Sequence, residues 1–420
     1  MDKKQLKQII TDQQTYFRNF GNIIDRKINL EYYMKGKEAV LISGIRRCGK
    51  STLLKLISKQ TKEKILYVNF DDIRLSELTI DNYQDIENIG YELNNNENIT
   101  YFFDEIQIAP KWEIWINNLH SKDKKVFLTG SNSKLLSSET STYLTGRNKT
   151  LNLYPFSFKE FLNLNQFDNP DLKSISTEQK NKILHLFDEY LENGGFPVVC
   201  INKDIELSRQ YFEDILIKDI QARYNLRQSS EINTLAVYLL SNTGRTYSYS
   251  TLKSVTGIKS LSTIKKYIDW MKNTFLIYTI DKFDYSLRKQ KVSSSKPYST
   301  DNSFLKTISA NFSNNKGRKL ENLAFLELKR RGEEIFYYSG KKECDFIIKK
   351  GLKAAEAIQV CFDAADPKTK EKEIQGLLEA MNKYKLQKGL ILTYDNEETL
   401  EIKNKKIILL PVWKWILENK

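Results

Sequence analysis

The chain has 420 residues, enough for about two to four domains, and its 66 basic and 53 acidic residues give a formal net charge of +13. Hydrophobic residues make up 40% of the sequence, which supplies sizeable cores and excludes general disorder. The four cysteines are far apart and there are only two histidines, so a zinc-finger or disulfide scaffold is excluded. Without a long apolar stretch or an apolar signal core, we expect a cytoplasmic protein with no membrane partner.

From about residue 25 to 160, short apolar runs alternate with helical patterns, as is typical of a parallel α/β sheet. The first 24 residues predict an amphipathic helix that leads into this region. The expected strands are Glu38–Ser43, Lys64–Phe70, Asn98–Phe103, Lys125–Thr129 and Lys149–Leu153.

The rest of the chain begins with helical patterns and ends as a second α/β region. Residues 156–228 predict helices, and residues 231–285 predict three more helical segments followed by a strand. The Ser-, Lys- and Asn-rich stretch 287–315 predicts a loop or domain boundary. Beyond it we expect helices at Leu320–Arg331 and 369–384, and strands at Ile335–Tyr338, Cys344–Lys349, Ala354–Phe362, Gly389–Tyr394 and Lys406–Leu410.

The strongest chemical signal is the run from Gly44 to Ser51, which matches the phosphate-binding pattern G-x-x-x-x-G-K-[ST] between an expected strand and an expected helix. Gly44 and Gly49 let the backbone curl so that successive N–H groups face phosphates at a helix N-terminus. Lys50 would bridge the β- and γ-phosphates, and the Ser51 hydroxyl would ligate Mg²⁺. We therefore expect ATP and Mg²⁺ as ligands. The predicted nucleotide-binding residues are Gly44, Ile45, Arg46, Arg47, Cys48, Gly49, Lys50, Ser51 and Thr52.

An acidic pair, Asp104 and Glu105, follows the expected strand Asn98–Phe103. Such a pair alone is usually a solvated turn, but downstream of a phosphate-binding loop it is typical of a Walker B segment. Asp104 would hold Mg²⁺ through water, and Glu105 would polarise the attacking water as a general base. The glutamate favours hydrolysis over nucleotide binding alone.

Two further positions could contact the phosphates. Ser131 and Asn132 end a strand expected between those of the loop and the acidic pair, where a polar residue would orient the water; the alternative is a simple Gly/Ser/Asn turn. Arg147 would stabilise transition-state charge in cis or from a neighbouring subunit, or is a solvated arginine. The predicted catalytic residues are Lys50, Glu105, Asn132 and Arg147, and the predicted metal ligands are Ser51 and Asp104.

Cys48 raises a separate hypothesis, because it lies inside the phosphate loop beside a helix N-terminus. This position favours a lowered thiol pKa, so that oxidation would block nucleotide entry.

The order of these motifs resembles a known family. GIRRCGKSTLL, VNFDD, YFFDEIQ, LTGSNSKLLSSET, LTGR and LYPFSFKEFL are similar to segments of prokaryotic AAA-type ATPases that carry an uncharacterised C-terminal domain. The similarity continues through GGFP, LIKDIQARY and ENLAFLELKRRG, over nearly the whole chain. The resemblance implies an α/β, AAA-type P-loop NTPase core at 1–155, a helical lid-like region at 156–228, a winged-helix-like domain at 229–290 and a restriction-endonuclease-like domain at 291–420.

That last domain would be a nuclease if its site were complete. The endonuclease-like core needs an acidic residue on its first helix, an aspartate on a strand and E-x-K on the next strand. Glu321 and Asp345 fill the first two positions, but the Glu and Lys positions fall on Gln359 and Cys361, and Glu356 has the wrong strand parity to substitute. An amide is a weak Mg²⁺ ligand and a thiol lacks the charge of lysine, so we predict a catalytically inactive domain.

A helix-turn-helix pattern in the winged-helix-like region gives a hypothesis of DNA contact, with protein packing as the alternative. The helical segments lie on either side of Gly257, and FLIYTIDKF would form a wing strand. The residues that could contact phosphates are Arg245, Lys253, Lys259, Ser260, Ser262, Lys265 and Lys266.

Three functions remain after these readings. The favoured one is Mg²⁺-dependent ATP hydrolysis coupled to conformational change in the C-terminal modules, acting on or with nucleic acid. The alternatives are an ATP-gated regulatory protein without turnover and, last, an ATP-dependent nuclease. The predicted partners are ATP together with DNA, RNA or a protein, and oligomerisation is left open.

Overall fold

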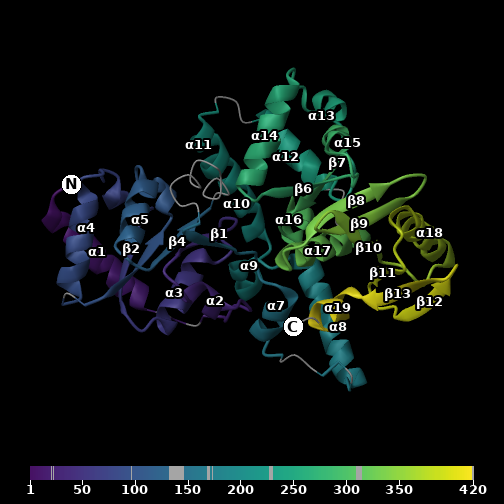
Figure 1. The fold of residues 1–420 in the computed structure, drawn as a ribbon, viewed down its shortest axis with the longest axis horizontal. Coiled ribbons are helices and arrows are strands. Elements are labelled where there is room, and N and C mark those ends of the chain that lie inside the picture. Colours follow the sequence, from purple (N-terminus) through teal and green to yellow (C-terminus); the bar gives the residue numbers. More distant parts are fainter. Residues whose placement is uncertain are drawn as a thin grey trace. The chain divides into compact units, whose positions relative to one another are not determined.

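The computed structural model describes residues 1–19, 21, 23–95, 97–131, 146–167, 171–172, 174–226, 230–308 and 315–418. The chain divides into two compact units (Figure 1). The first consists of Met1–Tyr154 with Asn273–Phe275, and the second of Pro155–Lys272 with Leu276–Lys420.

The first unit is built on a five-stranded parallel sheet with the order β2-β3-β4-β1-β5. Its strands are β1 (Ala39–Ser43), β2 (Lys64–Asn69), β3 (Ile99–Asp104), β4 (Val126–Gly130) and β5 (Asn148–Asn152). Its helices are α1 (Lys3–Arg18), α2 (Leu30–Met34), α3 (Lys50–Gln60), α4 (Asn82–Leu93) and α5 (Trp112–Ser121), with short turns η1 (Ile73–Leu75) and η2 (Ile106–Ile108).

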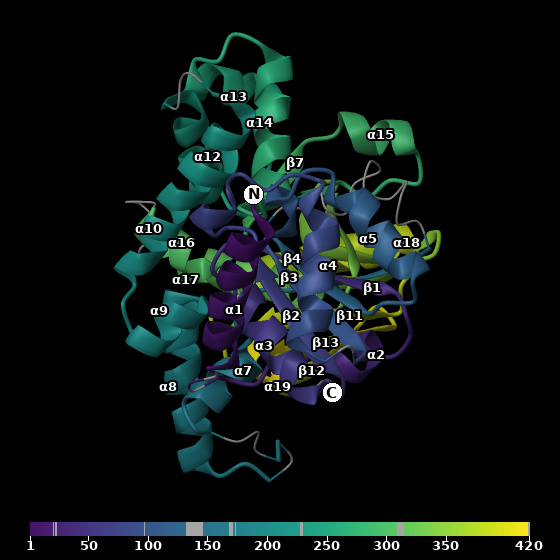
Figure 2. The ribbon, with the colours of Figure 1, turned by 90° about the vertical axis from the view of Figure 1, so that its left-hand side faces the viewer.

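Helices cover both faces of this sheet, so its central strands β1, β3 and β4 are buried along their whole length. Side chains from α1, α4 and α5 form one core with alternate residues of the strands, among them Leu41 and Phe103. Figure 2 shows α1 and α4 side by side in front of the sheet. The intervening strand residues point to the other face, where Phe17 stacks on Tyr67 with ring centroids 3.9 Å apart.

The parallel arrangement gives the sheet two chemically different edges. The carboxyl ends of β1, β3 and β4 carry Gly44, Glu105 and Ser131 at one edge, and β4 lies between β1 and β3 as predicted. The loops that precede the same strands lie at the opposite, amino edge. Ligands of open α/β sheets bind at the carboxyl edge.

The second unit begins with helices and ends on a six-stranded mixed sheet with the order β12-β13-β11-β10-β9-β8. Its helices are α7 (Phe158–Leu164), α8 (Thr177–Asn193), α9 (Pro197–Asn202), α10 (Glu206–Asp214), the π-helical η4 (Ile215–Gln221), α11 (Ala222–Tyr224), α12 (Ser230–Ser241), α13 (Tyr249–Thr256), α14 (Leu261–Asn273), α15 (Leu287–Val292), α16 (Asn302–Thr307), α17 (Lys316–Arg330), α18 (Pro367–Tyr384) and α19 (Val412–Glu418). Its strands are β6 (Ile277–Asp281), β7 (Ser295–Ser299), β8 (Glu334–Ser339), β9 (Glu343–Lys350), β10 (Lys353–Cys361), β11 (Lys388–Thr393), β12 (Glu398–Ile402) and β13 (Lys405–Pro411).

One expectation for this unit was wrong. The stretch 287–315, predicted as a loop or domain boundary, is not a loop, because it contains α15, β7 and α16. Strand β7 pairs antiparallel with β6, and four of its five residues are buried. The strand could not be predicted from its polar composition. Lys296 and Ser299 are buried against charged and polar partners rather than apolar ones, so the sequence shows no apolar run here.

The predicted α/β fold class is confirmed by the P-loop-type parallel sheet and the C-terminal sheet domain. The helix-turn-helix segment consists of α13 and α14 separated by Gly257, whose φ is +74°, with the β6–β7 hairpin after them. Its winged-helix nature and the restriction-endonuclease-like nature of the last domain stay predictions.

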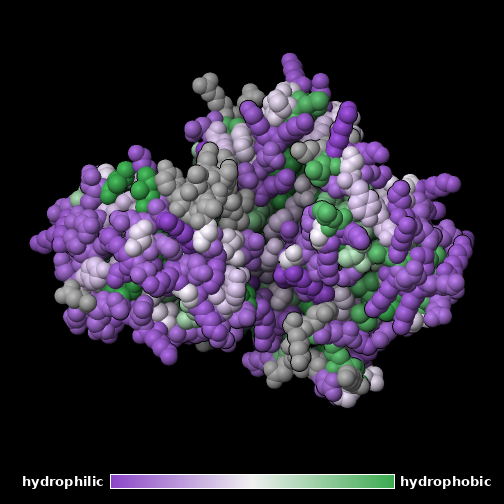
Figure 3. Space-filling model, viewed as in Figure 1, coloured by the Kyte–Doolittle hydropathy of each residue, from purple (hydrophilic) through white to green (hydrophobic). Residues whose placement is uncertain are grey.

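The surface is mainly hydrophilic on the face drawn in Figure 3, where hydrophobic residues gather only in separate small patches. Within the part of the chain that the structure describes, no helix has both the length and the apolar character needed to cross a bilayer.

Candidate functional site

The phosphate-loop motif lies between β1 and α3, where two glycines have roles that a side chain would prevent. A Cβ on Gly44 would lie 2.2 Å from the backbone oxygen of Leu153, so the loop could not keep its place against β5. Gly49 caps α3 with a φ of +100°, a conformation that L side chains rarely adopt. Both features keep the loop backbone bare at the N-terminus of α3, which is a favourable place for an anion.

Lys50 and Glu105 approach each other at the carboxyl edge of the sheet. The Lys50 ammonium is almost fully buried and donates to the backbone oxygens of Gly44 and Ile45, at 3.1 and 3.3 Å. Its Nζ lies 3.7 Å from Glu105 Oε1. The candidate ammonium and the candidate base therefore belong to one cluster, in which the loop carbonyls hold the lysine.

Asp104 is the most buried acid of this cluster and is surrounded by hydroxyls. Tyr67 donates to its Oδ2 at 3.1 Å, Thr129 donates to its Oδ1, and the nearby Ser51 hydroxyl favours the charged form of the same carboxylate. Burial raises the pKa of Asp104, and the neighbouring Glu105 raises it further. A cation placed beside this carboxylate would reverse both effects.

Thr129 was not predicted as a site residue, although it holds both acidic residues. Its hydroxyl accepts from the backbone N–H of Glu105 at 3.0 Å while it donates to Asp104. Glu105 itself has a left-handed backbone with φ +52°, and its Oε2 accepts from the Gln107 amide at 2.5 Å. The signal that could have found Thr129 is its place at the carboxyl end of the strand beside the acidic pair.

A second supporting residue, Arg26, was also missed because it lies outside every motif. Its guanidinium donates to the backbone oxygens of Cys48 at 3.0 Å and Tyr154 at 2.7 Å, and so ties the loop to the chain after β5. Cys48 is fully buried, and burial raises the pKa of its thiol. The expectation of a lowered pKa was therefore wrong, because desolvation outweighs the nearby Lys50 and Arg26 charges.

Of the two remaining predicted catalytic residues, one lies outside the described residues and the other, Arg147, lies away from this cluster. Asn132 lies outside the described residues, whereas Ser131 is described and its buried Oγ has no hydrogen-bond partner among them. Arg147 donates to Asn117 Oδ1 at 2.6 Å, and its backbone oxygen accepts from the N–H of Ala39, the first residue of β1. The phosphate loop begins after Ser43, the last residue of β1. At about 3.3 Å per residue, Ser43 lies about 13 Å along the strand from Ala39, beside which Arg147 lies.

In this structure Arg147 therefore lies at the amino edge of the sheet, and its predicted role at the phosphates is not tested by this position alone. The parallel register of β5 with β1 sets this position at the amino edge. A contact from a neighbouring subunit stays a prediction.

The residues present fit Mg²⁺ and a triphosphate. The hydroxyl oxygen of Ser51 and the carboxylate oxygens of Asp104 are the donor types that Mg²⁺ prefers, and the Ser51 hydroxyl lies close enough to favour the charged form of Asp104. The phosphate loop, whose close packing a Cβ at Gly44 would disturb, lies next to these two side chains.

A second cluster of charges lies in the second unit, around the ammonium of Lys296. This side chain is 1% exposed and lies 2.5 Å from Glu343 Oε1, 3.4 Å from Asp345 Oδ1 and 3.9 Å from Glu321 Oε1. The three carboxylates come from α17 and β9, whereas the lysine comes from β7. They raise the pKa of Lys296 against the opposing effect of its burial. Burial and Asp345 raise the pKa of Glu321 to about 8.

Other groups of the protein already hydrogen-bond to polar atoms in and beside this cluster. Asp345 Oδ2 accepts from the Val360 N–H at 3.0 Å, and Gln359 accepts from the Asp345 N–H at 3.1 Å while donating to Glu373 at 2.5 Å. Glu356 is exposed and pairs with Lys350, despite the irregular register of β10 between Ala354 and Glu356. Among the described residues no set of three acidic, His or Cys side chains is arranged to hold a metal ion.

Two family models match the chain. The first, described as an AAA domain, matches residues 36–162, and the second, a domain of unknown function (DUF8612), matches residues 184–315.

Relatives extend over almost the whole chain. The uncharacterized protein MJ1544 of Methanocaldococcus jannaschii is 33% identical over 99% of this chain and 96% of its own length. An uncharacterized protein of Haemophilus influenzae is 31% identical over 89% of this chain and 93% of its own. Among solved structures, the Walker-type ATPase paby2304 of Pyrococcus abyssi superposes with a TM-score of 0.43 and 15% identity, over 68% of this chain and 95% of that one.

Proposed function

The chain belongs to the family of AAA-domain proteins that contains the Methanocaldococcus jannaschii and Haemophilus influenzae relatives, and on this premise we propose that it is a Mg²⁺-dependent ATPase. The observation that carries the proposal is the cluster at the carboxyl edge of the parallel sheet. There the buried ammonium of Lys50 lies 3.7 Å from Glu105, between the bare loop of Gly44 and the buried carboxylate of Asp104.

Each proposed residue has one task. The loop from Gly44 to Thr52 binds the phosphates with its backbone N–H groups at the start of α3. When ATP binds, the Lys50 ammonium gives up its hydrogen bonds to the two loop carbonyls and donates to phosphate oxygens instead. Its positive charge then neutralises part of the phosphate charge. Glu105 accepts the proton of the attacking water, and its backbone N–H is held by Thr129.

Ser51 and Asp104 are the residues that would hold Mg²⁺, with Asp104 acting through water. The ion, when bound, supplies positive charge that polarises the phosphoryl oxygens. The hydroxyls of Tyr67 and Thr129 keep the Asp104 carboxylate oriented.

We further propose that the hydrolysis cycle acts on the modules of the second unit and through them on nucleic acid. The support is the exposed basic set around α13 and α14 (Arg245, Lys253, Lys259, Lys265 and Lys266). The Lys265 ammonium lies 5.1 Å from the centroid of the Tyr249 ring, which orients it at the surface. Exposure matters for this role, because the phosphates of a nucleic acid must reach the basic side chains.

In the same proposal the C-terminal sheet domain is not a nuclease. Lys296 supplies the ammonium that Cys361 cannot, but it sits among the carboxylates where a metal ion would have to bind. The role of this cluster is then to hold β7, α17 and β9 together.

The test is phosphate release from ATP by the purified full-length chain, with and without single- and double-stranded DNA and RNA. Turnover is expected in Mg²⁺, with a higher rate on the nucleic acid that the second unit binds. Lys50→Ala should abolish it, whereas Lys59→Ala, at an exposed position of the same helix, should retain it. Phosphate release no higher than that of Lys50→Ala under every condition would refute the proposal.

A further inference from the structure

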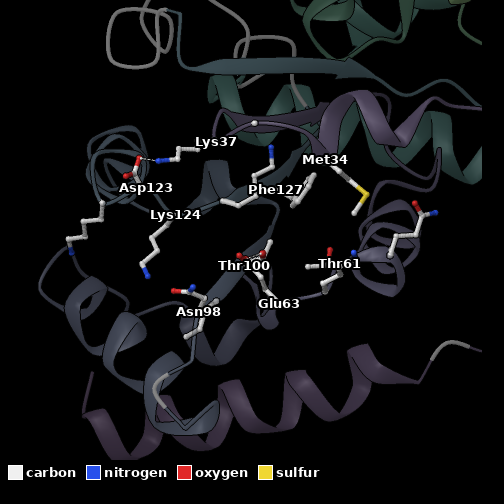
Figure 4. Close-up of a pocket in the computed structure, with 15 residues that line it drawn as sticks. Met34, Lys37, Thr61, Glu63, Asn98, Thr100, Asp123, Lys124 and Phe127 are labelled. Carbon is white, nitrogen blue, oxygen red and sulfur yellow. Dashed lines mark hydrogen bonds and ion pairs between the residues drawn. The ribbon is translucent and has the colours of Figure 1, made fainter.

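A basic pocket lies at the amino edge of the parallel sheet, opposite the edge that carries the phosphate loop. Its volume is about 600 Å³, which is within the range of small-molecule sites. The loops before β1, β2, β3 and β4 surround it. Figure 4 shows side chains from these separate loops, among them Lys37, Glu63, Asn98 and Lys124, around one open space.

The lining carries more positive charge than the protein compensates. Of its five lysines, Lys37 pairs with Asp123 at 2.8 Å, and Lys122 pairs with the buried Glu87 at 2.7 Å. The other three, Lys62, Lys124 and Lys125, have no ion pair among the described residues, and one lining carboxylate, Glu63, remains to oppose them. Helices α3 and α5 end at the rim, and their carbonyl ends offset about one further charge. About one positive charge is left over.

Lys125, a half-buried lysine of the pocket lining, shows the same excess of positive charge. Its ammonium donates to the backbone oxygens of Tyr33 and Glu38, each at 2.9 Å, and so keeps a fixed place. Burial and the nearby Lys149 lower the pKa of Lys125 to about 8, which means that too little negative charge surrounds it. A bound anion would remove that deficit.

Apolar side chains line the pocket beside these lysines. The Phe127 ring centroid lies 5.2 Å from the Lys125 ammonium, and Met34 and Ile99 are further lining residues. A ligand that fits both parts has a charged group and an apolar or flat body. Lysines act as point charges toward phosphates and do not demand planar geometry, so a tetrahedral phosphate suits them.

We propose that this pocket binds a terminal phosphate monoester attached to a flat body, either in a free nucleoside 5′-phosphate or at the 5′-phosphorylated end of a nucleic acid. The pocket shares no residue with the candidate hydrolytic site. The proposal therefore stands or falls independently of ATP hydrolysis.

Calorimetric titration of the full-length chain tests it with three probes: adenosine 5′-monophosphate, a 5′-phosphorylated pentanucleotide and the same pentanucleotide with a 5′-hydroxyl. The double variant Lys62→Glu/Lys124→Glu should weaken binding of a phosphorylated probe by at least about tenfold, because two attractions become repulsions. A control of equal charge change, Lys4→Glu/Lys341→Glu, alters exposed lysines outside the pocket and should leave binding unchanged. Lys50→Ala should also retain binding, since the phosphate loop is not involved.

Binding of only the mononucleotide, or only the phosphorylated oligonucleotide, supports the proposal and identifies the source of the phosphate. No binding of either phosphorylated probe overturns it. So does binding that survives Lys62→Glu/Lys124→Glu, binding that Lys50→Ala abolishes, or equal binding of the 5′-hydroxyl oligonucleotide.

Discussion

The hydroxyl of Thr129 on β4 donates a hydrogen bond to the carboxylate of Asp104 on the neighbouring strand β3. The same oxygen accepts from the backbone N–H of Glu105 at 3.0 Å, so one side chain holds both acidic residues of the candidate site. Because Thr129 and Asp104 are buried, neither partner has water as a substitute. The acidic pair is therefore oriented by the sheet itself.

Thr129→Val should lower ATP turnover by about 10- to 100-fold, because it removes this support while keeping the side-chain shape. Nucleotide affinity should change much less, since the phosphate loop is untouched. The matched control is Thr100→Val, a buried threonine near the other end of β3 that donates to Glu63. Equal effects of the two variants would contradict a special role for Thr129.

Gly44→Ala should reduce ATP affinity at least about tenfold, because the new methyl group would lie 2.2 Å from the Leu153 backbone oxygen. The backbone at Leu153, directly after β5, is held by a hydrogen bond from its N–H to the Ser43 oxygen, so the phosphate loop must move. Gly317→Ala is the control, since its Cβ would meet nothing closer than 3.6 Å. Fluorescent-nucleotide titration measures both variants, and wild-type affinity in Gly44→Ala would show that the loop does not bind ATP.

The sequence could predict those parts of the molecule whose signals are local. The five parallel strands have apolar runs, and the loop from Gly44 to Ser51 has fixed spacing, so both were found within one or two residues. Thr129 and Lys296 were missed, because their roles depend on partners from other strands and helices. The edge that Arg147 occupies could not be predicted, because the register of β5 against β1 sets it and the sequence around Arg147 does not.

Lys296→Met should destabilise the second unit by about 3–5 kcal/mol, because it leaves the carboxylates of Glu343 and Asp345 without the buried cation that they share. Urea unfolding followed by tryptophan fluorescence measures this change. Lys289→Met, at an exposed position of α15, serves as the control. A loss below about 1 kcal/mol in Lys296→Met would mean that the cluster contributes no more than a surface pair.

The raised pKa of Glu321 predicts a pH dependence of stability. Its pKa of about 8 in the folded chain lies above the ordinary glutamate value of 4.5, so the folded chain keeps a proton that the unfolded chain has lost. The stabilisation is complete below about pH 4.5 and is lost as the pH rises through about 8.

Glu321→Gln should flatten this decline in the free energy of unfolding, because an amide does not titrate. Urea midpoints measured at several pH values in this window compare the two proteins. If the free energy of unfolding of Glu321→Gln declines with pH as steeply as that of the wild type, groups other than Glu321 cause the decline.

The most direct test of ATP hydrolysis at the Lys50–Glu105 cluster is single-turnover cleavage of bound ATP by Glu105→Gln. If Glu105 is the base, the variant should bind ATP with nearly wild-type affinity but cleave it about 10²- to 10⁴-fold more slowly. Cleavage at the wild-type rate in Glu105→Gln would contradict the assignment of the catalytic base and with it the proposed mechanism.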